Sequence, residues 1–342
     1  MSNVEQAQVG KIRVFACGGA GINIANFFES DRGISQDGMA DLEITYVDTS
    51  LASIPADVSA EHFWKLEGAD GAIDGSGGKR AENAKDIADH NLEILHKHPA
   101  GDLTIVVSSM TGGSGSVFAN TIVSELLRQD KLVIVLAVGG DDTLQYIKNT
   151  ISSLMSYDKI AQLRQRPVIL HYSQNGQDGK KIKDVNAGIH KIISALQVLF
   201  SRQNRNLDSR DLYNALNFPE VTSYKPQVGV LTVNFGDLQI GDEQLITVAT
   251  LSSNMDNTRI NQLVEYQRVG VAEKFIAASS DKETLLKDDV PIHFAITDGF
   301  LDGVVKTLKK TQKQHEDLAA QRTIRNRLAD ESVETTDNGL VL

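Results

Sequence analysis

The stretch Thr104–Leu127, TIVVSSMTGGSGSVFANTIVSELL, decides the fold of this chain. Its first four residues, 104–107, are all β-branched and predict a short buried strand. A run of glycine and hydroxyl residues, Thr111–Ser116, follows almost at once. From Val117 on, the apolar residues recur at the spacing of one helix face. The order is therefore strand, glycine- and hydroxyl-rich loop, helix.

Such a loop is suited to bind an anion. Its backbone N–H groups lie at the N-terminus of a helix, where the helix dipole also favours negative charge. The hydroxyl groups of Thr111, Ser114 and Ser116 can donate further hydrogen bonds to phosphate oxygens. The alternative is a tight turn between strand and helix that binds nothing, and this stretch alone fits both interpretations.

A second unit of the same kind opens the chain. Residues 11–16 predict a strand, residues 18–21 (GGAG) form a glycine-rich turn, and residues 24–28 continue as a helix. By itself this turn is a weak signal, because GGAG is not the G-x-G-x-x-G of dinucleotide-binding folds. The G-x-x-x-x-G-K-[ST] sequence of P-loops does not occur in the chain either.

Composition limits the classes of protein that remain. A length of 342 residues suggests about two domains at ~150 residues each. The net charge of −11 argues against direct binding to nucleic acid or to an anionic membrane. The single cysteine, Cys17, excludes an internal disulfide and fits a reducing compartment. Without a signal peptide or a run of ~20 apolar residues, we expect a soluble cytoplasmic protein.

Acidic residues follow two further predicted strands. Asp48 and Thr49 come after the strand at 42–47, at the end of the sheet where open α/β folds bind ligands. Asp142 follows the apolar strand at 131–138 and is a candidate to contact a sugar hydroxyl. The alternatives are that Asp48 caps a turn and that Asp142 is merely solvated.

The glycine-rich segment 70–80 is expected to be a loop in which Gly77 and Gly78 permit close backbone approach or give plain flexibility. Strands and helices alternate up to residue 181, including a helix at about 143–156. This alternation predicts an α/β fold with a doubly wound parallel sheet.

A long helix is expected from residue 182 to about 202, and it is followed by the pattern N-x-D-x-x-D at Asn206, Asp208 and Asp211. The two carboxylates would lie close together if Asp208 caps a new helix and Asp211 stands in its first turn. The alternative is that the two aspartates are only an acidic helix cap.

The rest of the chain predicts a smaller α+β domain with a helix near 258–276. Three strands are expected, at 227–234, 245–251 and 291–296. A long charged helix should run from 301 to about 328, although its apolar face fades after residue 310. The remaining residues are acidic and then apolar, which is typical of a disordered tail.

Taken together and in this order, the motifs resemble those of the tubulin/FtsZ superfamily of GTPases. Residues 18–23 resemble the first phosphate loop, and Asn206–Asp211 resembles the N-x-D-x-x-D catalytic loop. Residues 111–116 resemble the GGGTG[ST]G signature, with Thr111 where the first glycine usually stands. The resemblance runs from about residue 11 to 300. TGGSGS, GGKR and NLDSRDL look most like phage-encoded tubulins of the PhuZ type.

The resemblance implies a tubulin/FtsZ-like architecture in four parts. The expected parts are a GTP-binding domain at 1–181, the central helix and catalytic loop at 182–212, an α+β C-terminal domain at 213–300, and a C-terminal helix with an acidic tail at 301–342.

It also implies roles for residues, with GTP or GDP and Mg²⁺ as the cofactors and no protein side chain assigned as a metal ligand. The α- and β-phosphates and the sugar would be bound by Gly18, Gly19, Ala20, Gly21 and Asn23. The γ-phosphate side would be contacted by Asp48, Thr49, Gly77 and Gly78. The phosphates would also be held by Thr111, Gly112, Gly113, Ser114, Gly115 and Ser116.

Two positions depart from the family pattern at the base. Asn186 stands where FtsZ has the acidic residue that contacts guanine, although an amide can donate to and accept from the guanine edge. Ile182 stands where FtsZ stacks an aromatic ring on the base, so only apolar contact is expected there.

The family mechanism implies that this chain polymerises head to tail. Asn206, Asp208 and Asp211 of one subunit would complete the active site at the nucleotide of the next, and GTP hydrolysis would follow assembly. The filament would position phage DNA in the infected bacterial cytoplasm. The acidic tail is expected to bind the neighbouring subunit, the alternative being a solvated end. Its residues are Asp330, Glu331, Glu334, Asp337, Leu340 and Leu342.

Two other functions stay open. A tubulin-like filament protein with little or no GTPase activity is allowed by Thr111 and Asn186, although the intact N-x-D-x-x-D argues against it. A Rossmann-type dinucleotide-dependent oxidoreductase would use Asp48 to bind the ribose, but it leaves the TGGSGS loop and the aspartate pair unexplained.

Overall fold

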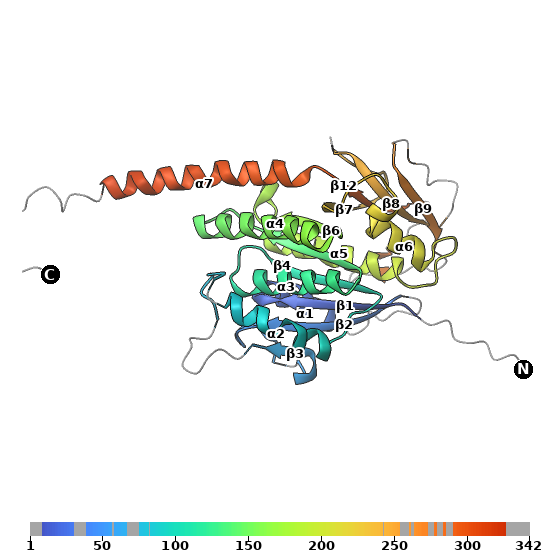
Figure 1. Cartoon of the computed structure of the whole chain (residues 1–342), viewed down its shortest axis with the longest axis horizontal. Helices are drawn as coiled ribbons and strands as arrows, with labels where there is room; N and C mark the ends of the chain where they lie inside the picture. Colours follow the sequence, from blue (N-terminus) through green and yellow to red (C-terminus); the bar gives the residue numbers. More distant parts are fainter. Residues whose placement is uncertain are drawn as a thin grey trace, which may run out of the picture.

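The computed structural model shows a layered α/β protein with one long helix at the C-terminal side (Figure 1). It describes residues 9–30, 39–56, 58–66, 75–81, 83–241, 243–253, 260, 263–272, 277–278, 283–284 and 290–325. Within these ranges, the helices are too short or too polar to cross a membrane.

A single sheet of ten strands runs through the described chain in the order β3-β2-β1-β4-β5-β6-β7-β12-β8-β9. The strands from β3 to β7 in this order pair in parallel, and β12 pairs antiparallel with both β7 and β8. Their bounds are β1 Lys11–Cys17, β2 Asp41–Asp48, β3 Phe63–Lys65, β4 Leu103–Ser109, β5 Val133–Gly139, β6 Val168–Gln174, β7 Val228–Phe235, β8 Leu245–Ser252, β9 Tyr266–Val271 and β12 Ile292–Thr297. A separate two-residue pair joins β10 Ala277–Ala278 and β11 Glu283–Thr284.

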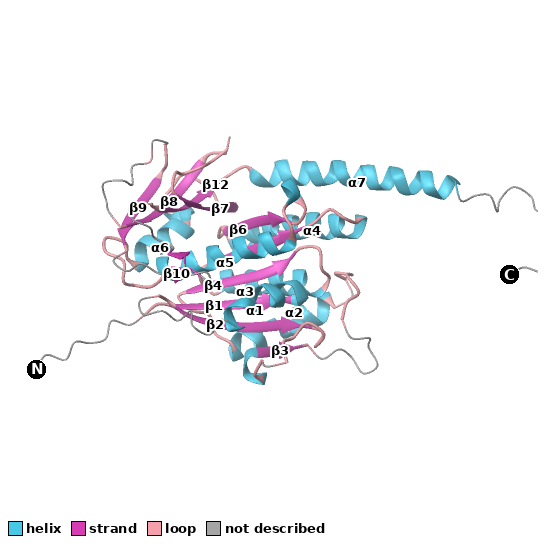
Figure 2. Cartoon of the chain, turned by 180° about the vertical axis from the view of Figure 1, so that it is seen from behind, coloured by secondary structure: helices cyan, strands magenta, loops and turns pink. Residues whose placement is uncertain are grey.

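Helices cover both faces of this sheet (Figure 2). Alternate residues of β1 point to opposite faces: Val14 packs in the cluster with α1 and α5, and Phe15 in the cluster with α2, α3 and α4. The helix bounds are α1 Gly18–Ser30, α2 Ala84–Lys97, α3 Ser114–Arg128, α4 Leu144–Arg164, α5 Ile182–Leu199, α6 Ser209–Leu216 and α7 Phe300–Arg325. The predicted doubly wound sheet is thus confirmed.

One predicted element is wrong. The segment 258–276 was expected to contain a helix, but its described part contains strand β9, which pairs in parallel with β8. The sequence YQRVGV at 266–271 has the β-branched and aromatic residues that suit a strand. Pairing with the neighbouring strand, which is remote in sequence, decides the conformation here. β3 was not predicted because it is only three residues long.

The central helix α5 connects the two ends of the sheet. It begins after β6 at the carboxyl ends of the parallel strands and runs back to their amino ends. There Ser201 accepts a hydrogen bond from Gly10 N–H just before β1, and Arg202 forms an ion pair with Asp102 just before β4. The chain after α5 therefore begins at the amino ends of the parallel strands, which is the end of the sheet opposite the glycine-rich loops.

Replacing Phe118 with alanine tests the packing of the α2–α3 layer. The Phe118 side chain is fully buried, and its ring meets that of Trp64 edge-on at 6.2 Å between centroids. We expect Phe118→Ala to lower the free energy of unfolding by about 3–5 kcal/mol, measured by urea denaturation with circular dichroism. Leu163→Ala on α4 is the matched control, because that side chain is 71% exposed. Equal effects of the two variants would contradict this packing.

Candidate functional site

The two glycine-rich loops touch each other backbone to backbone at the carboxyl ends of β1 and β4. Gly18 has a φ of +71°, and a Cβ atom there would lie 2.7 Å from the Cα of Gly115. A Cβ atom at Gly115 would in turn lie 2.6 Å from the carbonyl oxygen of Cys17. Real Cβ atoms do not come that close, so both positions require glycine.

A cavity of about 260 Å³ lies where these loops meet. It is lined by residues of four segments: Cys17, Gly18, Gly19, Ala20, Asp48, Thr49, Ser50, Gly75, Ser76, Ser109, Thr111, Gly112, Gly113, Ser114 and Gly115. The structure thus brings together most of the residues that were predicted to contact phosphates.

Hydroxyl groups surround the start of α3 in this cavity. The Ser114 N–H donates to Ser76 Oγ at 3.0 Å, and the Ser114 and Thr49 hydroxyl oxygens are 2.8 Å apart. The Ser76 oxygen therefore accepts from a backbone N–H at the helix N-terminus, as a phosphate oxygen does in anion sites of this kind.

Two residues that the sequence analysis did not assign tie the loop at 75–81 to the phosphate-loop candidate. Asn149 of α4 donates to the carbonyl oxygens of Gly78 at 2.9 Å and Thr111 at 2.7 Å. Arg80 donates to Ser116 Oγ at 2.9 Å. Asn149 gave no signal because it lies on a helix without a motif, whereas Arg80 is part of the GGKR stretch that was noted only as a resemblance.

The other residues that were predicted to bind the nucleotide lie outside the lining of this cavity: Gly21, Asn23, Gly77, Gly78, Ser116, Asp142 and Asn186. Asn23 is exposed on α1, and Asn186 lies on α5 one turn before His190, whose ring contacts the Ile24 carbonyl oxygen at 2.8 Å. Asn23 and Asn186 are therefore on neighbouring stretches of two packed helices. Asp142 is exposed and is absent from the lining residues of the cavity.

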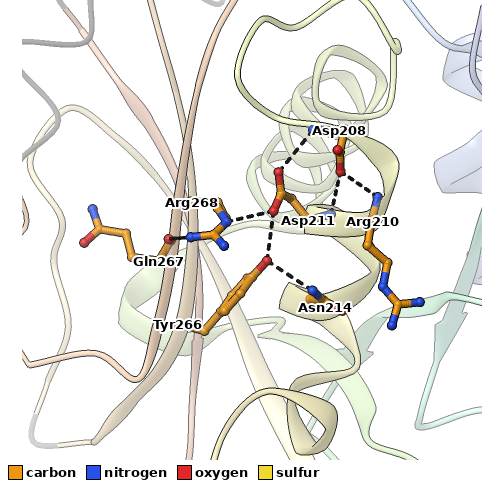
Figure 3. A network of polar contacts seen from close by, with 7 residues as sticks. All are labelled: Asp208, Arg210, Asp211, Asn214, Tyr266, Gln267 and Arg268. Atoms are coloured by element: carbon orange, nitrogen blue, oxygen red, sulfur yellow. Dashed lines mark hydrogen bonds and ion pairs between the residues drawn. The ribbon is translucent and has the colours of Figure 1, made fainter.

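The N-x-D-x-x-D segment forms the start of α6 (Figure 3). Asp208 is the N-cap, and its Oδ1 accepts from the backbone N–H groups of Arg210 and Asp211, each at 2.9 Å. Asp211 Oδ2 accepts from the Asp208 N–H at 3.4 Å, which completes a capping box. Asn206 has a φ of +62°, a conformation that asparagine tolerates better than most residues. The predicted proximity of the two aspartates is confirmed.

Strand β9 holds this segment from the side. Arg268 Nε donates to Asp211 Oδ1 at 2.7 Å, and the Tyr266 hydroxyl donates to the same oxygen at 3.1 Å (Figure 3). Arg205 and Val271 exchange two backbone hydrogen bonds of 2.9 Å. Sequence reasoning missed Tyr266 and Arg268 because it predicted a helix in this region.

These contacts change the acidity of Asp211. Burial raises the pKa of its carboxyl group, but hydrogen bonds from Arg268, the Asp208 N–H and Tyr266 outweigh burial, so the pKa lies below its ordinary value. Asp211 is therefore ionised at neutral pH.

The aspartates and the cavity lie at opposite ends of the sheet. The cavity follows the carboxyl ends of β1 and β4, whereas α6 follows the end of α5 that lies beside the amino ends of the same strands. One subunit therefore carries the two groups of residues too far apart to act on the same ligand.

The chain is similar to phage tubulin-like proteins. It is 27% identical over 343 residues to the phage tubulin-like protein of Pseudomonas phage phiKZ, covering 97% of this chain and 98% of that protein. It resembles the protofilament of TubZ from bacteriophage PhiKZ with a TM-score of 0.77 at 27% identity, covering 91% and 92% of the two chains. It shares the fold of the phage tubulin PhuZ with GDP, with a TM-score of 0.76 at 21% identity, covering 91% and 93%. No protein-family model matches the chain.

Replacing Arg268 with glutamine tests the contact to Asp211. Because the pKa of Asp211 is lowered in the folded state, the contact stabilises the fold above pH ~4 and is lost as pH falls through the folded-state pKa. The Arg268 side chain is 49% exposed, so solvent screening limits the expected loss at pH 7 to less than about 1 kcal/mol. Urea denaturation at pH 7 and pH 3 would measure it.

Arg210→Gln is the matched control, since it removes a cation from the same segment without touching the Asp211 carboxylate. A difference between Arg268→Gln and the wild type that persists unchanged at pH 3 would contradict the assignment.

Proposed function

Because this chain belongs to the phage tubulin-like branch of the tubulin/FtsZ superfamily, we propose that it is a GTPase that acts as a head-to-tail filament. The observation that carries the proposal is the separation of the phosphate-binding loops from Asp208 and Asp211 at opposite ends of one sheet. Stacking one subunit on the next brings the aspartates of one copy to the nucleotide of the other. A contact between unlike surfaces that does not close into a ring generates a filament.

The cavity fits the phosphate chain of GTP or GDP. It offers glycine backbone from two loops and the hydroxyl groups of Thr49, Thr111 and Ser114. At Gly112 no atom lies within 4 Å of where a Cβ would stand, so the loop is open on that side. We propose that Asn23 and Asn186, on the flank formed by α1 and α5, contact the sugar and the base, which the packing of these two helices supports. The structure of PhuZ with GDP supports a guanine nucleotide as the ligand.

Mg²⁺ would be bound mainly by oxygens of the nucleotide. Among the described residues there is no group of three or more His, Cys, Asp or Glu side chains that could hold a metal ion. Asp48 is the one carboxylate among the residues that line the cavity, and it is buried. Such a site, with one carboxylate and several phosphate oxygens, is typical of Mg²⁺ bound to a nucleotide. The ion would offset negative charge on the β- and γ-phosphate oxygens.

The neighbouring subunit supplies the groups that act on water. Asp208 and Asp211, with Asn206 beside them, accept hydrogen bonds from the attacking water and orient it toward the γ-phosphate. Because the pKa of Asp211 is lowered, this residue is in the ionised form that accepts such a bond at neutral pH. Hydrolysis then depends on assembly, and loss of the γ-phosphate weakens the contact between subunits.

In this proposal, each of the four parts predicted from the sequence has its own function in the filament. Residues 1–181 bind the nucleotide, 182–212 carry the catalytic loop to the other end, and 213–300 support that loop through β9. Residues 301–342 supply the part of the chain that would bind the next subunit. By analogy with phage tubulins, the filament positions phage DNA in the cytoplasm of the infected bacterium.

A filament with little GTPase activity is the second candidate, and one observation favours it. Both aspartates already have partners within the subunit, since Asp208 caps α6 and Asp211 is bound by Arg268. If stacking does not turn an oxygen with spare acceptor capacity toward the γ-phosphate, the water is not oriented by either aspartate. The two candidate functions share the filament and the bound nucleotide, and they differ only in the rate of GTP hydrolysis.

Asp208→Asn separates them in a pelleting assay that also measures phosphate release. Asparagine caps helices as well as aspartate does, so the fold should be preserved while a negative charge is lost. We expect wild-type protein to pellet with GTP and release phosphate only above a critical concentration. The variant should pellet but release phosphate at least tenfold more slowly.

Asp237→Asn, a change of the same kind on the turn after β7, serves as the control and should hydrolyse GTP normally. Pelleting of the wild type without phosphate release would favour the second candidate. If the rate of phosphate release per subunit does not change with protein concentration, the active site is not shared between subunits, and the proposal is contradicted.

Truncation after residue 328 tests the proposed role of the tail, whose residues lie outside the described part of the chain. If the tail binds the neighbouring subunit, its removal should raise the critical concentration for GTP-dependent pelleting several-fold. The affinity of the monomer for GTP should stay the same. An unchanged critical concentration would contradict the role.

A further inference from the structure

Arg80 lies between the loop at 111–116 and helix α4 and is surrounded by neutral hydroxyl groups. Its Nη1 donates to Ser116 Oγ at 2.9 Å and also to Ser153 Oγ. The phenol of Tyr157 interacts electrostatically with it, and burial raises the pKa of that phenol, so Tyr157 is neutral. All three neighbours are therefore uncharged.

Arg80 has no carboxylate partner among the residues that the structure describes. Other partly or fully buried arginines do have one: Arg13 pairs with Glu43, and Arg166 pairs with Asp130. Burial lowers the pKa of Arg80, but a guanidinium stays protonated in proteins. An unpaired, partly buried cation is unfavourable, so this position indicates an anion that binds nearby.

The contacts of Ser116 show where that anion would bind. Ser116 Oγ accepts from Arg80 and donates toward the carbonyl oxygens of Gly112 at 2.7 Å and Gly113 at 3.0 Å. Gly112 and Gly113 line the cavity, whereas Ser116 and Arg80 stand behind them. The charge of Arg80 is thus separated from the cavity by a single layer of loop backbone.

We propose that Arg80 is a positioning residue for the phosphate chain of the bound nucleotide, which it stabilises from behind the loop through Ser116. The inference rests on the proposed function and assigns a residue to it. It implies that the affinity gained from each added phosphate depends on the Arg80 charge. The guanidinium also fixes the loop at 75–81 to α3 and α4, so the cavity keeps its shape before the nucleotide enters.

Arg80→Gln is the main test, because glutamine keeps a donor for Ser116 and loses the charge. Binding of GTP and GMP to the full-length monomer is measured by titration calorimetry. We expect the affinity for GTP to fall on the order of tenfold and that for GMP clearly less, because the lost attraction grows with the number of phosphate charges. Without nucleotide, the variant should be at least as stable as the wild type.

Two further variants make the result specific. Lys85→Gln makes the same chemical change at an exposed cation in the first turn of α2 and should leave the ratio of GTP to GMP affinity unchanged. Arg80→Lys keeps the charge without the planar fork and should restore most of that ratio. A merely structural role would lower both affinities equally and would not be restored by lysine.

The outcomes separate this inference from the proposed function. If the wild type binds no guanine nucleotide, the proposed function fails. If the wild type binds GTP and Arg80→Gln keeps the wild-type ratio of GTP to GMP affinity, only the role of Arg80 is overturned. The role of Arg80 is also overturned if Arg80→Lys does not restore the ratio of GTP to GMP affinity.

Discussion

The structure depends on the contact between the backbones of Gly18 and Gly115. This contact lets the first turns of α1 and α3 approach each other at the ends of two adjacent strands, β1 and β4. Two helix N-termini then point into one cavity, and their dipoles add at the same place. Any side chain at either glycine would push the loops apart, and the hydroxyl groups around Ser114 would no longer surround one site.

Helix α4 supports this cavity from the side of the sheet that carries α7. Asn149 holds the carbonyl oxygens of two loops, Ser153 accepts from Arg80, and Lys148 forms an ion pair with Glu316 of α7 at 3.6 Å. One helix thus contacts the candidate γ-phosphate loop on one side and the long C-terminal helix on the other. The loop at 75–81 and α7 therefore share contacts with the same helix.

The opposite end of the sheet is organised by an edge strand. β9 binds the loop after α5 through Arg205 and Val271, and it binds Asp211 through Tyr266 and Arg268. A Cβ atom at Gly270 would lie 2.6 Å from the Cβ of Leu207, so the strand lies directly against the N-x-D-x-x-D segment. The C-terminal region therefore sets the geometry of the aspartates that the filament would present to the next subunit.

The sequence by itself determined the two glycine-rich loops, the central helix and the aspartate pair. Each of these is local: the glycine-rich segments 18–21 and 111–116 closely follow their strands, and the spacing of Asp208 and Asp211 is that of one helical turn. Only the tertiary structure decided how Arg80 and Asn149 tie the loops to α4, and that Arg268 binds Asp211. These partners are 36 to 73 residues apart in the sequence, and no local pattern indicates such pairs. The conformation of residues 266–271 was decided in the same way, because a strand is stabilised by its neighbour in the sheet and a helix by its own hydrogen bonds.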